Sequence, residues 1–537
     1  MGRRPTGYVG GVLRFFVLAG LVVLGALTVL AAAIGGWGWW VLAAVLLGLL
    51  ALGCYDLLQK RHSVLRNYPV LGHLRFLLEG IRPELQQYFI ERNFDGRPYD
   101  RDTRSAIYQR AKGVKEEQPY GTERDLESVG YEYLVHSTAP VPPMDHTPRV
   151  RIGGPDCTRP YDMALLNVSA MSFGSLSANA IEALNRGAAQ GGFAHDTGEG
   201  AISPYHRNGG DLVWEIGSGY FGARADDGHF DEAQFADKAA DPQVKMVSLK
   251  LSQGAKPGIG GVLPAAKVSA EIASTRGIPQ GEKCISPAYH HVFSTPRELV
   301  RFIARFRELA GGKPAGFKLC VGSRVDVLAI CKAMVEEGVT PDFIVVDGAE
   351  GGTGAAPLEY EDHVGMPLTE GLMTVHNALV GVGLRDRVRI GASGKVSSGI
   401  DVVKRIIQGA DYTNAARAMM QAVGCIQSQR CHTNRCPVGV ATQDPKRMRA
   451  LDVPTKTERV VRYQAAVVDQ ATQVIASMGL SSFDELRPHM LRRRVHDGEI
   501  SSYAELFHHL EPGELLGSPP AAWERDWLAA DPDRFQP

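Results

Sequence analysis

The longest apolar stretch of the chain lies near its amino terminus. Residues 15–55 contain no Asp, Glu, Lys, Arg or His, and only a short glycine- and tryptophan-rich segment at residues 35–38 interrupts the apolar run. A helix needs about 20 apolar residues to span a bilayer, so this length predicts two transmembrane helices joined by a tight turn. A cleavable signal peptide has an apolar region of only about 7–15 residues, which favours the hairpin.

Charged residues next to this run predict its orientation. Trp37, Trp39 and Trp40 fall at the turn, where indole rings favour the membrane interface, and the turn carries no charge. Basic residues flank both ends of the run: Arg3, Arg4 and Arg14 before it, and Lys60, Arg61 and Arg66 after it. Basic flanks stay on the cytoplasmic side, so we expect an inner (cell) membrane protein whose remaining chain lies in the cytoplasm.

A second pattern starts at residue 164, where short apolar runs, glycine-rich or polar loops and amphipathic segments recur. Helices are expected at 178–189, 297–310, 325–337 and 400–408, between several of eight strands. The eight strands are predicted at 166–170, 192–196, 246–251, 283–286, 317–321, 343–347, 388–392 and 412–414. Eight such units predict an α/β fold, a TIM (β/α)8 barrel with helical flanking segments. A doubly wound sheet would show a GxGxxG turn after its first strand, and no such turn follows the first predicted strand here.

Four regions follow from these patterns. We expect the transmembrane hairpin at 1–61, a helical and loop lead-in at 62–160, the barrel at 161–450 and a charged helical tail at 451–537. Residues 197–241 are expected to form an insertion that walls the active site. Hydrophobic residues make up 44% of the chain, which excludes disorder, and the net charge of -1 gives no electrostatic footprint for nucleic acid.

Three closely spaced cysteines are the sharpest chemical signal: Cys425, Cys431 and Cys436 in GCIQSQRCHTNRCPVG. Soft thiolates at short spacings hold the irons of iron–sulfur clusters, and three of them suit a three-iron cluster or a four-iron cluster completed from elsewhere. A zinc site that adds His432 is the rival, although adjacent residues seldom face one tetrahedral centre. Buried thiols without a metal are the third reading.

Loops of glycine and small residues follow several predicted strands. In a TIM barrel, the loops after the seventh and eighth strands form a phosphate site. In this chain these two loops are the Gly394 loop and the loop from Asn414 to Arg417. A phosphorylated cofactor such as FMN suits this arrangement, with the loop after the first strand against the flavin. The cofactor-binding candidates in these loops are Met171, Ser172, Asp347, Gly351, Gly352, Gly394, Asn414, Ala415, Ala416 and Arg417.

Ionisable residues in or near apolar strands mark a candidate catalytic site. Lys250 lies in an apolar strand, where an unpaired ammonium is costly, so it should meet an anion. Gln253, Lys256 and Arg276 follow it, and Glu199 ends the second predicted strand. Lys318 in FKLCV is expected at the flavin edge that becomes negative on reduction. His290 and His291 suit either acid–base groups or a hydrogen-bonded core pair.

The segments MSFGSLSANA, DTGEGA, LKLSQGAKPGIGG, ISPAYHH, DGAEGGTGAAP and GCIQSQRCHTNRCPVGVATQDP resemble the FMN-binding synthase domain of glutamate synthase. The arrangement of the whole chain is similar to that of stand-alone, membrane-anchored members of this family. The resemblance implies a TIM barrel, FMN and a 3Fe-4S cluster on the cysteine trio. It also implies reductive amination, in which 2-oxoglutarate and ammonia form 2-iminoglutarate and a hydride from FMN N5 gives glutamate.

The resemblance also implies roles for individual residues. Lys250, Lys256 and Arg276 match residues that bind 2-oxoglutarate or the flavin, and Glu199 matches a glutamate at the ammonia entrance. The chain departs from the family pattern at Val262, where the family has glutamine, at Ala201 and Ile202 in TGEGAI, and in NAARAMM after the eighth strand. These departures keep a second reading open, in which the same cofactors act on another amino or imino acid.

The expected electron donor and ammonia source are inferred from two motifs that we do not find in the predicted positions. None of the predicted strands is followed by a GxGxxG dinucleotide fingerprint, and there is no amidotransferase nucleophile, so NADPH and glutamine are expected to be poor direct substrates. We expect a separate electron-donor protein, a ferredoxin or an NADPH-linked iron–sulfur flavoprotein, with ammonia that is free or supplied by a separate glutaminase. A third reading is a membrane electron-transfer subunit without turnover of its own.

Overall fold

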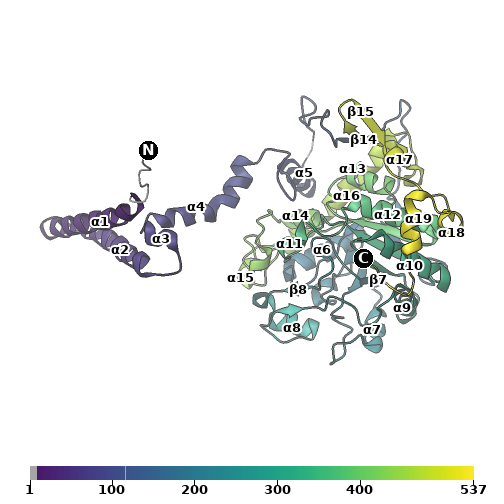
Figure 1. The fold of residues 1–537 in the computed structure, drawn as a ribbon, viewed down its shortest axis with the longest axis horizontal. Helices are drawn as coiled ribbons and strands as arrows, with labels where there is room; N and C mark the ends of the chain where they lie inside the picture. The colour runs from purple at the N-terminus through teal and green to yellow at the C-terminus, as the bar shows by residue number, and fades with distance from the viewer. Residues whose placement is uncertain (1–8, 115–116, 537) are drawn as a thin grey trace, which may run out of the picture. The chain divides into compact units, whose positions relative to one another are not determined.

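The computed structural model describes residues 9–114 and 117–536, with side chains from residue 15 onward (Figure 1). The chain divides into two compact units, one up to Gly96 and the other from Arg97 onward, and each is described by itself. Arg3 and Arg4, on which the orientation prediction depends, lie outside the described residues, as does the side chain of Arg14.

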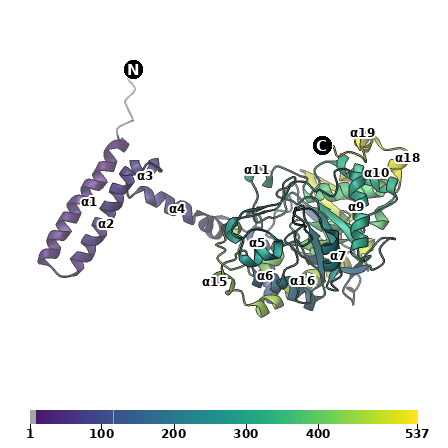
Figure 2. The same cartoon turned by 90° about the horizontal axis from the view of Figure 1, so that it is seen from below.

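The first unit contains the two predicted apolar helices, α1 (Val9–Ile34) and α2 (Gly38–Leu58). They lie side by side and are joined at residues 35–37 (Figure 2). Residues Phe15–Ile34 and Gly38–Leu58 have mean hydropathies of 2.7 and 2.3 and are long enough to cross a membrane. Large apolar side chains such as Phe16 and Leu30 face outward, as expected for a helix pair in an apolar surrounding.

A buried carboxylate fixes the chain where α2 ends. Asp56 is fully buried, accepts a hydrogen bond from the Val70 amide at 2.9 Å and pairs with His73 Nε2 at 2.9 Å. These contacts hold the segment that leads through α3 (Ser63–Asn67) into α4 (Gly72–Leu85) and the π-helical turn at Gln86–Ile90.

The second unit is built on a closed barrel of eight parallel strands (Figure 1), which confirms the predicted TIM barrel. The barrel strands are β4 (Leu166–Val168), β5 (His195–Asp196), β6 (Leu212–Ile216), β7 (Val244–Lys250), β10 (Ala315–Leu319), β11 (Phe343–Asp347), β12 (Arg389–Ser393) and β13 (Tyr412–Ala415). The barrel closes where Thr413 of β13 pairs with Leu166 of β4. The helices that connect the strands are α6 (Ala178–Gly191), α7 (Glu232–Ala239), α9 (Pro296–Leu309), α10 (Arg324–Glu337), α12 (Leu368–Gly381) and α13 (Gly399–Ile407).

One predicted barrel strand is wrong. Residues 283–286 contain β9 (Cys284–Ile285), which pairs antiparallel with β8 (Val262–Leu263) in a small hairpin outside the barrel. The third barrel strand is instead β6, inside the region that the sequence analysis assigned to an insertion. Its sequence LVWEI is buried at every position, including Glu215. The long excursion therefore follows β7 at residues 251–295, where it carries the β8–β9 hairpin and α8 (Ala270–Arg276).

The amino-terminal mouth of the barrel is covered by a hairpin of β2 (Arg149–Ile152) and β3 (Tyr161–Ala164). Ile152 and Met163 pack there in one apolar cluster with barrel residues such as Phe343 and Tyr412, the first residues of their strands. The carboxyl ends of the strands remain for chemistry, as is general in TIM barrels.

Helix α16 (Val453–Ser477) packs along α5 (Arg101–Lys112), α6, α13 and α14 (Arg417–Val423). Its buried residues Val460, Tyr463, Val467, Ala471 and Ile475 recur every three to four positions, the spacing of one helix face. This apolar stripe is the reason that the segment forms a long helix against the barrel rather than a free surface helix.

The tail beyond α16 is helical only in part. The stretch MLRRRVHDGEI was expected in a helix, but it forms β14 (Leu491–His496) and the start of β15 (Glu499–Ser502), which join β1 (Glu132–Leu134) in an antiparallel sheet. Leu491 is buried in the core, the next four residues of β14 are half-buried, and His496 is exposed. Short helices complete the unit: α11 (Leu358–Glu361), α15 (Pro445–Met448), α17 (Tyr503–Leu506), α18 (Glu514–Gly517) and α19 (Ala521–Ala529).

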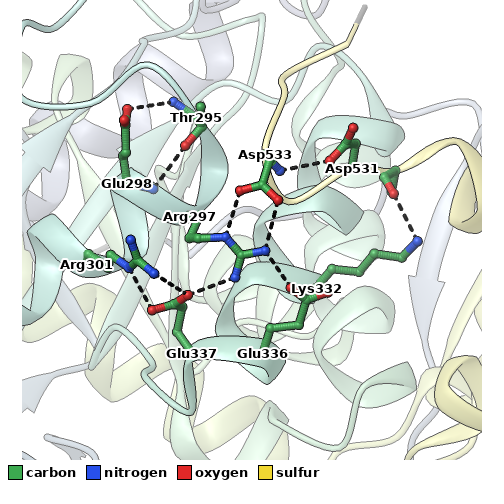
Figure 3. Close-up of polar contacts among 10 residues, drawn as sticks. Thr295, Arg297, Glu298, Arg301, Lys332, Glu336, Glu337, Asp531 and Asp533 are labelled. Atoms are coloured by element: carbon green, nitrogen blue, oxygen red, sulfur yellow. Dashed lines mark hydrogen bonds and ion pairs between the residues drawn. The ribbon is translucent and has the colours of Figure 1, made fainter.

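The carboxyl-terminal segment is attached to α9 and α10 by a network of charged residues (Figure 3). Arg297 contacts Asp533 at 2.7 Å, Glu337 at 2.7 Å and Glu336 at 2.6 Å, and its amide donates to the Pro532 carbonyl. Lys332 Nζ also donates to the Ala530 carbonyl at 2.9 Å. One arginine thus ties two helices and the tail together.

Candidate functional site

The carboxyl ends of the strands bring together the four residues predicted to be catalytic. We refer to Glu199, Lys250, Lys256 and Arg276 as the rim cluster. Lys250 ends β7 and its Nζ lies 2.8 Å from Glu199 Oε1, in the loop after β5. The same ammonium donates to Gln253 Oε1 at 2.5 Å. Lys250 therefore meets an anion, as its position in an apolar strand predicts.

Arg276, the last residue of α8, reaches the loop after the first barrel strand. Its Nη2 donates to Ser172 Oγ at 3.2 Å and to the Phe173 carbonyl at 3.1 Å, and its guanidinium lies 5.3 Å from the centre of the Phe221 ring. Its Nε is buried and has no hydrogen-bond partner among the described residues. The arginine thus keeps a donor free, beside the predicted contact residues Met171 and Ser172.

The rim cluster carries more positive than negative charge. Burial alone would raise the pKa of Glu199, but Lys250, Lys256 and Arg276 outweigh it and lower that pKa to about 2. Burial, together with the nearby Lys250, lowers the pKa of Lys256 to about 8. Lys256 is only 4% exposed and makes no hydrogen bond or ion pair with any described residue. Three cations face one carboxylate, so the site lacks anions.

A second charged group lies in the strands. We refer to Asp196, Glu215, Lys318 and Asp347 as the barrel cluster. Lys318 of β10 forms an ion pair with Glu215 of β6, Asp196 Oδ1 accepts from the Gly198 amide at 2.9 Å, and Asp347 Oδ2 accepts from the Gly254 amide at 2.8 Å. All but Asp347 are less than one tenth exposed.

The charge balance of the barrel cluster is the reverse of that at the rim. Three carboxyl groups share one ammonium. Burial, reinforced by the charge of Glu215, raises the pKa of Asp196, and burial also raises that of Asp347. Burial would lower the pKa of Lys318, but the three carboxylates outweigh it and raise that pKa. A proton therefore remains on the acids, and Lys318 remains charged.

The loops after β11, β12 and β13 lie close together. A Cβ on Gly351 would lie 2.9 Å from the Gly348 carbonyl, and one on Gly352 would lie 2.9 Å from Arg417 Cδ. Gly394 has a φ of +148°, which favours glycine. Asn414 pairs in register with Ser393, Ala415 ends β13, and Ala416 caps α14, which begins at Arg417. A side chain at Gly351 or Gly352 would collide with the neighbouring protein atoms, so glycine here lets these loops approach one another closely.

Two cations lie at these loops. Arg417 donates to the Glu350 carbonyl at 2.6 Å and lies 5.5 Å from the centre of the buried Tyr99 ring. Burial, with repulsion from Arg417, lowers the pKa of Lys395, which follows Gly394 and makes no hydrogen bond or ion pair within the described part of the chain. Two neighbouring cations with one unpartnered ammonium are suited to a phosphate.

The cysteine trio lies beyond the end of α14. Burial raises the pKa of Cys425 to about 12 and that of Cys431, and each of these thiols also responds to the charge of Cys436. The Gln427 amide donates to Cys425 Sγ at 3.4 Å, and Lys267 lies near Cys431 and Cys436. Across the described residues, no three His, Cys, Asp or Glu side chains are arranged to hold a single metal ion.

The structure also decides the reading of His290. Its Nε2 bonds the Lys250 carbonyl at 2.8 Å and its Nδ1 bonds the Tyr220 hydroxyl at 3.2 Å, while burial lowers its pKa to about 4. Both ring nitrogens are engaged, which fits a hydrogen-bonded core histidine.

A comparison with known proteins concerns the same part of the chain that contains these site residues. A family described as a conserved region in glutamate synthase matches residues 158–481. The chain belongs to the glutamate synthase family. The matched region contains the barrel, the rim cluster, the barrel cluster and the cysteine trio.

The chain is similar to several members of the glutamate synthase family. It is 36% identical over 491 residues to the glutamate synthase large subunit-like protein YerD of Bacillus subtilis, which covers 84% of this chain and 93% of that protein. It is 36% identical over 321 residues to an archaeal-type glutamate synthase (NADPH) of Thermotoga neapolitana, which covers 59% of this chain and 60% of that one. Among solved structures, mandelate oxidase aligns with a TM-score of 0.40 at 15% identity, too weak a likeness to compare ligands.

The sequence analysis missed Asp196, Glu215 and Lys395 as members of the site. Glu215 carries the same signal that identified Lys318, an ionisable residue within an apolar strand. It went unnoticed because β6 itself was not predicted. Lys395 directly follows Gly394, but only the structure shows that it lies near Arg417, with which it forms a pair of cations.

Proposed function

We propose that this protein is a glutamate synthase-type oxidoreductase that carries out reductive amination of 2-oxoglutarate to glutamate. The observation that carries the proposal is the charge of the rim cluster. Its three cations exceed its one carboxylate by two positive charges, which matches a 2-oxo acid with two carboxylates. The family relationship supports the same reaction class.

Each rim residue has a role in this reaction. Arg276 and Lys256 bind the two carboxylates, since one keeps a free Nε and the other an unpartnered ammonium. Lys250 is held by Glu199 and Gln253 and orients the substrate carbonyl. Glu199 stays ionised, so it attracts incoming ammonium, which loses a proton to water before ammonia attacks the carbonyl carbon. Loss of water then gives 2-iminoglutarate.

The loops at the strand ends fit FMN. Reduced FMN, when bound, supplies the hydride that converts 2-iminoglutarate to glutamate. Lys395, Arg417 and the Gly394 loop hold the phosphate, because they combine two neighbouring cations with a glycine in a conformation that other residues rarely adopt. Lys318 keeps its positive charge near the expected flavin edge, and Glu215 holds its ammonium in place.

The cysteine trio suits a 3Fe-4S cluster that feeds electrons to the flavin. Burial raises the pKa of Cys425 and Cys431, so bound iron would compensate thiolates that the protein alone disfavours. A zinc site that adds His432 is the rival. Metal analysis separates the two, because iron with sulfide supports the cluster and stoichiometric zinc refutes it.

We further propose that α1 and α2 anchor the protein in the cell membrane with the barrel in the cytoplasm. Electrons come from a ferredoxin or an NADPH-linked iron–sulfur flavoprotein, and ammonia comes from solution or from a separate glutaminase. Fractionation of cells tests the anchor: the full chain should sediment with membranes, and a chain lacking residues 15–58 should not.

The decisive experiment follows flavin reoxidation in the chemically reduced, detergent-solubilised chain. Ammonium with 2-oxoglutarate should reoxidise the flavin and produce glutamate, while NADPH with glutamine should give no turnover. Lys256→Gln should abolish flavin reoxidation at a low concentration of 2-oxoglutarate. The control Lys446→Gln, which alters an exposed lysine outside the rim cluster, should not. A preparation that folds without flavin, or that shows no response to any 2-oxo acid, would refute the proposal.

Val262 favours one alternative, in which the same site acts on a different amino or imino acid. It stands where the family has glutamine, pairs with Ile285 in the β8–β9 hairpin and adds no hydrogen-bonding side chain. A panel of 2-oxo acids separates the two readings. Preference for a dicarboxylate supports 2-oxoglutarate, whereas preference for an apolar monocarboxylate supports the alternative.

A further inference from the structure

A cavity lies beside the rim cluster. It has a volume of about 190 Å³ and is bounded by the loop at residues 219–228 and by the segment at residues 278–287. Pockets for drug-sized ligands measure about 300–1,000 Å³, so this one suits a smaller molecule. Its lining includes Phe221, Arg224, Ile278, Glu282, Lys283 and Cys284.

The charged residues of this cavity lack partners. Arg224, Glu282 and Lys283 have side chains that form no hydrogen bond or ion pair with other described residues. The Arg224 guanidinium lies 5.9 Å from the centre of the Phe221 ring, so its planar fork is positioned at the wall. An arginine fork matches a carboxylate in geometry and charge.

Only a thin wall separates this cavity from the rim cluster. Arg276 and Arg224 both lie within 6 Å of the Phe221 ring centre, at 5.3 Å and 5.9 Å. Cys284 lines the cavity, and its thiol is close enough to both guanidiniums for their charges to act on it. Anything bound against Phe221 and Cys284 therefore presses on residues that support Arg276.

We propose that this cavity is a second ligand site that binds an acidic amino acid of the glutamate class. Two unpartnered cations and one unpartnered carboxylate are complementary to a molecule with two carboxylates and one ammonium. Arg224 and Lys283 take the carboxylates, Glu282 takes the ammonium, and Ile278 contacts the aliphatic chain. The ligand has the charge pattern of the product under the proposed function, so occupancy next to Arg276 would report product concentration to the rim.

Protection of Cys284 tests this site without turnover. The detergent-solubilised full chain is treated with N-ethylmaleimide, and modification of the peptides with Cys284 and Cys157 is followed by mass spectrometry. L-Glutamate should slow modification of Cys284 at least tenfold at saturation and leave the half-buried Cys157, on another loop, unchanged. Equal modification of Cys284 with and without L-glutamate overturns the proposal.

Variants place the ligand in this cavity rather than at the rim. Arg224→Gln should raise the half-protecting concentration of L-glutamate at least tenfold, and the control Arg301→Gln, on the outer surface of α9, should not change it. Lys256→Gln should also leave it unchanged. Loss of protection in Lys256→Gln, or full protection in Arg224→Gln, overturns the site.

Two further measurements keep the test decisive. If Arg224→Gln does not fold, Lys283→Gln takes its place, since Lys283 is exposed and supports no packing. Lys283→Gln should raise the half-protecting concentration of L-glutamate, because it removes a contact to a ligand carboxylate. Equilibrium dialysis of labelled L-glutamate against the Lys256→Gln chain should show one bound ligand, with weaker competition by glutarate, which lacks the ammonium. No binding refutes the proposal. Failure of 2-oxoglutarate turnover leaves these results intact, so the two proposals fail separately.

Discussion

The barrel cluster and the rim cluster are neighbouring groups of four charged residues with opposite balances. In the barrel cluster, three carboxyl groups surround Lys318, and Asp196 retains a proton because burial and Glu215 raise its pKa. In the rim cluster, three cations surround Glu199, and Lys256 has no partner. Protons complete the first group, whereas the second remains incomplete until an anion binds.

This difference separates structural from binding electrostatics. A buried ion pair with internal partners resists change, because removal of one member leaves an uncompensated charge. A buried cation without a partner is costly in the free protein, and its cost is recovered only when a ligand supplies the opposite charge. Changes in the barrel cluster should therefore alter stability, while changes in the rim cluster should alter substrate binding.

The largest effect is expected for Glu215→Ala. This change leaves the Lys318 ammonium buried without its ion-pair partner and should lower the free energy of unfolding by about 3–5 kcal/mol. Chemical denaturation of the solubilised chain measures it. Arg301→Ala, which removes a pair on an exposed arginine, is the control and should cost no more than about 1 kcal/mol. Equal losses in both variants would contradict the comparison.

Lys256→Gln should have the next largest effect, on substrate rather than on stability. Loss of an unpartnered cation that meets a substrate carboxylate corresponds to about 2–3 kcal/mol, or roughly 30- to 150-fold in affinity. Steady-state kinetics should show this as a higher KM for the 2-oxo acid. A variant that loses kcat with an unchanged KM would show that Lys256 acts on the chemical step instead.

The pH dependence of binding sharpens the role of Lys256. Its pKa of about 8 in the free protein means that it is charged below pH 8 and neutral above, so affinity for a dianion should fall as the pH rises through 8. Lys256→Arg should flatten this dependence, because arginine stays protonated. The measurement is KM for the 2-oxo acid between pH 6.5 and 9.5, about two pH units around that pKa. If the pH dependence of KM were identical in the unmodified protein and in Lys256→Arg, a group other than Lys256 would be responsible for it.

The smallest effect is expected for Asp196→Asn. An asparagine resembles the protonated acid in shape and still accepts from the Gly198 amide, so the free energy of unfolding should change by less than about 1 kcal/mol near neutral pH. Denaturation under the conditions used for Glu215→Ala gives the comparison. A loss as large as that of Glu215→Ala would mean that Asp196 is ionised in the folded protein.

The barrel could be predicted because its strands are apolar runs bounded by glycine and polar loops. The strand β6 was missed because LVWEI contains a glutamate and follows a two-residue β5, so the pattern looked like one long insertion. The β9 segment was misplaced because a two-residue strand in an outer hairpin has the same local composition as a barrel strand. Tertiary pairing, which local pattern does not encode, decides both cases.

Site residues could be predicted where a charged residue lies within an otherwise apolar strand. Lys250 and Lys318 are charged residues in apolar strands, and both lie in buried ion pairs. Their partners were harder to find, since the pairing of Lys318 with Glu215 joins residues about a hundred positions apart. The cavity beside Phe221 had no sequence signal at all, because it arises from the approach of two loops that follow different strands.

The excursion after β7 has a consequence for how such a protein diversifies. Lys256, Arg276, Val262 and Cys284 all belong to this one uninterrupted stretch, while the barrel cluster is distributed over four strands. Substitutions at these four positions would therefore change ligand binding without altering the four strands that carry the barrel cluster. Ligand choice can therefore diverge within one loop segment while the barrel strands stay the same.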